Sequence, residues 1–111
     1  SRNFLTLSPP YPVERTLKKL GENLRTARLR RNLTIAEVAE KIGTGPRAVG
    51  DAERGKPSTG AVVYVALLWV YDLLEPLGAV ADPDSDEQGL ALIDNRQRAR
   101  GPAKQGLDDD F

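Results

Sequence analysis

The strongest constraint on this chain comes from a short segment with a helix start signal and a helix stop signal. The tetrapeptide T-I-A-E at 34–37 has the pattern of a capping box, in which the first hydroxyl and the last carboxylate each accept a backbone amide of the other residue. Apolar residues follow at helical spacing, and Gly43 suits a turn that needs positive φ. The pattern predicts a helix over 35–42 that ends in a tight turn.

A longer helix is predicted before this segment. Residues 1–11 are expected to form an extended arm, because Pro9 and Pro10 disfavour helix there. Pro12 suits the first turn of a helix, where its missing amide has no partner in any case. A leucine-rich stripe with 3–4 spacing then predicts a helix over about 12–31.

Three more helices are predicted after the turn. Pro46 opens one over about 46–54, and Gly55 ends it. A fourth helix over about 60–72 is apolar all round, so both of its faces should be buried, and a short fifth is expected over about 73–77. Part of the fourth helix is therefore expected in a dimer interface. The expected interface residues are Val63, Leu67, Trp69 and Val70.

The remainder of the chain is predicted to be a tail, residues 79–111. Ser85 begins a second capping-box pattern, which introduces a weak helix over about 86–98. No run is long and apolar enough for a membrane span, and residues 1–12 lack the pattern of a signal peptide. We therefore expect a cytoplasmic protein with an all-α domain over 12–78.

The residues that are missing exclude most catalytic chemistry. The chain has no Cys, no His and no Met, which removes thiolate nucleophiles, zinc fingers and Ser-His-Asp triads. No nucleophile–base pair and no cluster of metal ligands can be assembled from what remains. The sequence predicts no enzyme, no cofactor and no metal.

The charges are separated along the chain although their sum is zero. Residues 12–57 hold eleven basic and six acidic residues, a net +5, while residues 72–94 hold seven acids and no base. This asymmetry is typical of a basic binding face with an acidic tail, the alternative being ordinary solvated surface. Divided in this way, the charges favour binding to nucleic acid.

Three short helices with Gly43 in the joining turn fit a helix-turn-helix, whose second helix enters the DNA major groove. The residues L-T-I-A-E-V-A-E-K-I-G at 33–43 and A-E-R-G-K-P at 52–57 resemble the Cro/phage-repressor-type (XRE) helix-turn-helix family. The resemblance covers about 20–78 and implies a five-helix lambda-repressor-like domain. It also implies a partly buried structural ion pair between Arg28 and Glu53.

The same resemblance places the recognition helix at residues 45–54. It implies DNA contacts from the following residues: Thr34, Thr44, Gly45, Pro46, Arg47, Ala48, Asp51, Arg54 and Lys56. Arg47 is the long donor there, for either a guanine edge or a phosphate, and Asp51 either accepts from cytosine or forms a local salt bridge. The chain departs from the family at Ile35, at 45–46 and at Gly50, which predicts thin direct readout supplemented by DNA shape.

The flanking segments resemble the HipB-like antitoxins, small regulators that pair with HipA-type kinase toxins. This second resemblance implies a homodimer that represses its own operon on double-stranded operator DNA and binds a Ser/Thr-kinase toxin. The acidic tail is expected to dock in a partner, to fold over the basic face, or only to solubilise the chain. Its residues are Asp108, Asp109, Asp110 and Phe111. The alternatives to an antitoxin are a stand-alone phage-type repressor and a protein-interaction scaffold without DNA.

Overall fold

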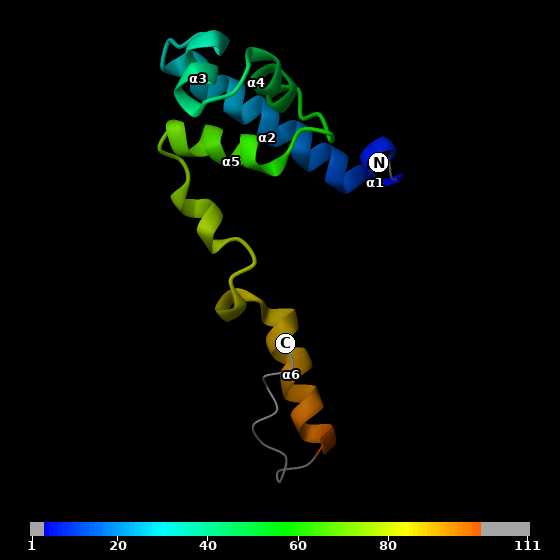
Figure 1. Cartoon of the computed structure of the whole chain (residues 1–111). Coiled ribbons are helices and arrows are strands. Elements are labelled where there is room, and N and C mark those ends of the chain that lie inside the picture. The colour runs from blue at the N-terminus through cyan, green and yellow to red at the C-terminus, as the bar shows by residue number, and fades with distance from the viewer. Residues whose placement is uncertain (1–3, 101–111) are drawn as a thin grey trace. The chain divides into compact units, whose positions relative to one another are not determined.

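The computed structural model describes residues 4–100, and every regular element within that range is a helix (Figure 1). This confirms the predicted all-α fold class. The chain divides after Glu75 into two compact units, so the predicted boundary at residue 78 lies just beyond the division. The elements are α1 (Phe4–Leu7), α2 (Tyr11–Arg30), α3 (Ile35–Ile42), α4 (Pro46–Glu53), α5 (Ala61–Val70), η1 (Glu75–Ala79), η2 (Pro83–Ser85) and α6 (Glu87–Arg100).

The first unit is built around α4, which contacts α2, α3 and α5 (Figure 1). Each of these helices contributes its apolar face to one small core. The core residues are Leu24, Ala27, Val38, Ala39, Val49, Ala52, Tyr64, Leu67 and Tyr71. Because α4 is packed against helices on several sides, the orientation of its exposed face is fixed by the whole unit.

The four long helices of this unit end in the same way. In each one, the amide beyond the last turn bonds back to a carbonyl five residues earlier, and the residue before it has a positive φ, as in a Schellman motif. Gly43 and Gly55 fill that position after α3 and α4, whereas Asn32 and Asp72 fill it after α2 and α5. Asparagine and aspartate tolerate this left-handed conformation better than most residues.

Two glycines bring the backbones of α2 and α4 into direct contact. A Cβ on Gly21 would lie 2.6 Å from the carbonyl oxygen of Ala52, and a Cβ on Gly55 would lie 2.5 Å from the Cα of Lys18. Neither position has room for a methyl group without a shift of backbone atoms. The C-terminal end of α4 therefore lies as close to α2 as two backbones can pack.

The second unit has little core. It contains most of η1, together with η2 and α6, and none of their residues is buried. The Asp86 side chain accepts from the Gly89 amide at 3.0 Å and so starts α6. The capping residue predicted at Ser85 is thus wrong by one residue, because Ser85 belongs to η2 and Asp86 is the cap.

Two other predictions are wrong in detail. Residues 1–11 are not extended throughout, since Phe4–Leu7 form α1 and the Ser8 amide donates to the Phe4 carbonyl at 2.7 Å. The prolines constrain only the residues beside them, so the helix forms before Pro9. The predicted fifth helix over about 73–77 is instead the 3-10 helix η1, because Pro76 disfavours the α-helical backbone at the residue before it.

Candidate nucleic-acid interface

One side of α4 faces away from the core. Val49, Ala52 and Glu53 are buried, whereas residues on the opposite side of α4 are accessible to solvent. We call this accessible face the α4 stripe, and its residues are Arg47, Gly50, Asp51 and Arg54. Gly50 has no side chain, so its position in the middle of the α4 stripe has no side-chain group that could contact a base.

Arg47 is the unpaired cation of the α4 stripe. It is exposed, and no other residue between 4 and 100 forms a hydrogen bond or ion pair with its side chain. Asp51, in contrast, forms a salt bridge to Arg54, and its second oxygen lies 3.9 Å from Lys56 Nζ. Of the two roles open to Asp51 in the sequence, the structure therefore shows the local salt bridge.

The amino-terminal ends of α3 and α4 are built differently. At α3 the Thr34 hydroxyl accepts from the Glu37 amide at 3.0 Å, and Glu37 accepts from the Thr34 amide at 2.8 Å. The hydrogen bond from the Thr34 amide is the largest cause that lowers the pKa of Glu37, and the Thr34 side chain adds to it. At α4 the cap residue is Gly45, which supplies no side-chain oxygen, and Pro46 follows it. The Thr44 amide donates to the Ala39 carbonyl at 2.9 Å and so closes the turn between the helices.

A buried ion pair joins α2 to α4. Arg28 Nε donates to Glu53 Oε2 at 2.6 Å, and a second nitrogen donates to Oε1 at 3.0 Å. The third guanidinium nitrogen donates to the Leu33 carbonyl at 2.9 Å, just before α3. The hydrogen bond to Glu53 raises the pKa of Arg28. The Arg28 guanidinium thus joins α2 to α4 through Glu53, as the resemblance implied. It also joins α2 to Leu33, in the segment that precedes α3.

A second arginine supports the fold in a way that the sequence did not reveal. Arg31 donates to the Ala27 carbonyl at 2.9 Å and to the Tyr71 carbonyl at 3.0 Å. Its guanidinium also lies over the Tyr71 ring, 5.4 Å from the ring centre, which is a cation–π contact. Tyr71 lies at the end of α5, forty residues later, so no local pattern signals this contact.

The exposed face of α5 differs from the predicted dimer interface. Leu67 is fully buried within its own chain, so its inclusion was wrong, while Val63 and Val70 pack partly against the same core. An all-apolar helix has no polar face to mark which side turns inward. The exposed apolar residues of α5, which we call the α5 stripe, are Val62, Val65 and Trp69.

The sequence of the first unit matches a known family. Residues 19–79 match a family model described as a helix-turn-helix domain, and the match covers more than half of the chain. The chain belongs to the helix-turn-helix domain family. Searches of curated proteins and of solved structures found no match.

The helix-turn-helix domain carries DNA binding and regulation as its family role, and such domains are typically not enzymes. Its helix-turn-helix consists of α3, the turn at Gly43 and α4. The four tail residues from Asp108 to Phe111 lie outside the described residues. Within residues 4–100, no group of three or more possible metal ligands occurs, and no helix is long and apolar enough to cross a membrane.

Proposed function

We propose that this helix-turn-helix protein is a dimeric, sequence-specific DNA-binding repressor that places α4 in the major groove of operator DNA. The observation that carries the proposal is the state of Arg47, an exposed cation without a partner in the described chain, on the first turn of α4. A helix that enters the groove contacts base edges with its amino-terminal residues. Arg47 is thus the best placed donor for a guanine.

The cations at the end of α4 support contacts to phosphates more than contacts to bases. Arg54 and Lys56 are both held by Asp51, so their charges gather at the carboxyl end of α4. Thr34, Thr44, Gly45, Pro46 and Ala48 complete the proposed DNA face, with backbone amides at the ends of α3 and α4 near the phosphates. We infer that one direct contact is supplemented by readout of DNA shape.

The α5 stripe supplies the proposed dimer contact. Trp69 is 60% exposed, and Val62 and Val65 lie on the same face of α5. Large exposed aromatic residues in an apolar patch are typical of protein interfaces. A two-fold axis at this patch relates the two copies of α4 in the dimer. The two copies then bind DNA half-sites that lie about one DNA turn, roughly 34 Å, apart.

The DNA proposal is tested by titrating the full chain with DNA from its own promoter at several salt concentrations. The affinity should fall steeply with salt, because phosphate contacts release counterions. Arg47→Ala should weaken binding about tenfold and relax preference at one base pair, if the guanidinium reads guanine. If it holds only a phosphate, the loss is equal for all sequences and the salt slope falls by about one.

Arg98→Ala is the matched control, because it removes the same charge from α6, where Arg98 is paired with Asp94 at 2.7 Å. It should leave operator affinity unchanged. Binding that is indifferent to salt and to both substitutions contradicts the DNA proposal and favours the scaffold alternative.

We further propose that the protein is an antitoxin that binds and neutralises a HipA-type kinase toxin in the cytoplasm. The resemblance of the flanking segments supports this, and so does the second unit, whose exposed Leu92 lies outside the α4 stripe. A toxin held by the second unit would use other residues than those of the proposed DNA face.

The antitoxin proposal is tested by co-expressing the full chain with the protein encoded beside it. A kinase that co-purifies with the chain, and that loses activity in the complex, supports the proposal. A neighbour that does not bind, or is not a kinase, leaves the stand-alone repressor as the better description.

A further inference from the structure

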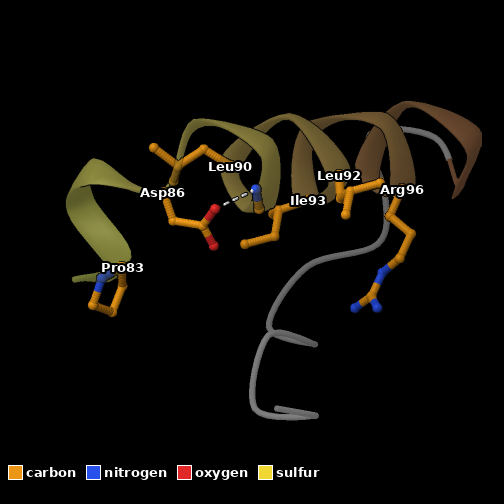
Figure 2. Close-up of a pocket in the computed structure, with 7 residues that line it drawn as sticks. Pro83, Asp86, Leu90, Leu92, Ile93 and Arg96 are labelled. Atoms are coloured by element: carbon orange, nitrogen blue, oxygen red, sulfur yellow. Dashed lines mark hydrogen bonds between the residues drawn. The ribbon is translucent and has the colours of Figure 1, made fainter. Parts of the chain in front are cut away.

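Helix α6 carries its side chains almost entirely on the surface. None of the residues from Glu87 to Arg100 is buried, and Leu90 is 49% exposed. Its main contact among the described elements is the short η2. A hollow of about 350 Å³ lies between η2 and α6, lined by Pro83, Leu90 and Ile93 among others (Figure 2). Much of the apolar surface of α6 is therefore open within residues 4–100.

One face of α6 has the spacing of a helix-pairing seam. We call it the α6 stripe, and its residues are Asp86, Leu90, Ile93, Gln97 and Arg100. Their separations alternate between four and three residues, which is the repeat that keeps one face of a helix toward a partner helix. The aliphatic residues are at the centre, and polar residues are at both ends.

The charges around the α6 stripe are divided by sign. Asp82, Asp84, Asp86 and Glu87 gather at the amino-terminal end, and Arg96, Arg98 and Arg100 gather at the carboxyl-terminal end, where Asp94 offsets one charge by pairing with Arg98. In a parallel pair of such helices, like charges would face each other at both ends. In an antiparallel pair, the acidic end of each helix faces the basic end of the other.

We propose that α6 packs antiparallel against α6 of a second copy of this chain, as an additional contact of the dimer. The register that joins the aliphatic residues pairs Leu90 with the second copy's Ile93, and Ile93 with the second copy's Leu90. The same register brings Asp86 beside the second copy's Gln97. It also brings Asp84 near the second copy's Arg100. A two-fold axis between the two Leu90–Ile93 pairs makes both halves of the contact identical.

This contact is too small to form a dimer alone. A helix of fourteen residues is marginal in water, and the pair joins only two aliphatic residues from each copy. The α5 dimer changes this, because tethered helices meet at an effective concentration in the millimolar range. The inference thus rests on the dimer of the proposed function, and its test must report the dimer separately.

The test uses disulfide crosslinking, for which this chain is a clean background because it contains no cysteine. Glu87→Cys and Gln97→Cys are made separately in the full chain. In the proposed register Gln97 lies opposite Asp86, one residue from Glu87, and Asp86 itself is kept because its side chain starts α6. In that register, two copies of the same variant hold their cysteines about 14–16 Å apart along the axis, from a rise of about 1.5 Å per residue. That separation is too long for a disulfide.

An equal mixture of the two variants should yield a crosslinked dimer under mild oxidation, whereas each variant alone should yield little. Adding Leu90→Asp to both variants should abolish the crosslink. Ala91→Asp is the matched control, because residue 91 lies off the α6 stripe, and it should preserve the crosslink. Circular dichroism checks that both aspartate variants keep the same helix content.

Sedimentation of the reduced proteins reports the α5 dimer independently. A dimeric mass with the mixed crosslink supports the inference. A dimeric mass with no crosslink, or with equal crosslinking of each variant alone, overturns the antiparallel pairing and leaves the α5 dimer intact. A monomeric mass overturns the dimer and the α6 pairing together.

Discussion

Arg28 is the residue on which the arrangement of the first unit depends most. The residue is 7% exposed, and its guanidinium donates to Glu53 and to the Leu33 carbonyl, so all of these partners lie outside its own helix. Separating such a pair leaves a charge buried without compensation. The sequence showed that both residues are present, but only the resemblance to a known family indicated that they meet.

Arg28→Ala or Glu53→Ala should destabilise the fold by about 3–5 kcal/mol, because each leaves the other charge buried and unpaired. Urea unfolding measures the change. Replacing both together, as Arg28→Met with Glu53→Leu, should recover most of the loss. Arg98→Ala breaks the exposed pair with Asp94 and should cost about 0.5 kcal/mol or less. Equal losses for the buried and exposed pairs would refute this ordering.

Two buried tyrosines of α5 and its end differ in what their hydroxyl groups contact. The Tyr64 hydroxyl donates to the Lys56 carbonyl at 3.1 Å and so fastens the loop after α4. The Tyr71 hydroxyl is buried and has no hydrogen-bond partner in the part of the chain that the structure describes. Burial raises the pKa of both phenols, and the charge of Glu53 adds to this at Tyr71.

Tyr71→Phe should leave stability at neutral pH unchanged or raise it by up to about 1 kcal/mol, because it removes an unsatisfied polar group. Tyr64→Phe should lose about 1 kcal/mol with its hydrogen bond. Because the pKa of each phenol is raised in the folded state, the free energy of unfolding falls as pH rises above the ordinary tyrosine pKa, about 10. Both variants should therefore lose less stability at alkaline pH. A large loss at neutral pH in Tyr71→Phe would contradict the assignment.

Helix ends show how far sequence reasoning reached at the scale of elements. The turns at Gly43 and Gly55 were predictable because glycine has no steric penalty at positive φ. The same turn at Asn32 and Asp72 was not, because these residues adopt it only where the surrounding packing requires it. The inward side of α5 was likewise hidden, since Leu67 and Trp69 are equally apolar in sequence yet opposite in burial.

Gly21→Ala should destabilise the fold by about 1–3 kcal/mol, because its Cβ would overlap the carbonyl oxygens of Ala52 and Glu53. Gly50→Ala is the matched control inside a helix, where the nearest atom to a new Cβ is in the Arg54 side chain at 3.6 Å. It should stabilise by about 0.5–1 kcal/mol through helix propensity. Thermal unfolding compares the two, and an equal response to both would show that the α2–α4 contact is looser than described.

At the scale of the whole molecule, the proposed dimer contact at α5 determines how the two copies of α4 bind DNA. The α5 stripe and the α4 stripe belong to the same packed unit, so an altered α5 contact changes where two copies of α4 lie on a duplex. A monomer that binds one half-site loses the gain from binding two linked sites.

Trp69→Asp should therefore convert the dimer to a monomer, which sedimentation measures as half the mass. It should also weaken operator binding, while thermal stability stays near that of the parent chain. Val80→Asp is the control, since Val80 is also exposed but lies in the second unit. It should change neither mass nor affinity. A Trp69→Asp chain that remains dimeric would place the dimer contact elsewhere.

The contact between Gly21 and the end of α4 has a consequence for the DNA that this protein accepts. Two backbones in contact cannot approach further, and the tight turn at Gly55 keeps them from sliding apart. The distance between α4 and α2 is thus set by backbone atoms, and a change of side-chain rotamer cannot alter it. In the proposed dimer, these two glycines and the α5 contact together fix the distance between the two copies of α4, and operators lengthened by one base pair should be rejected.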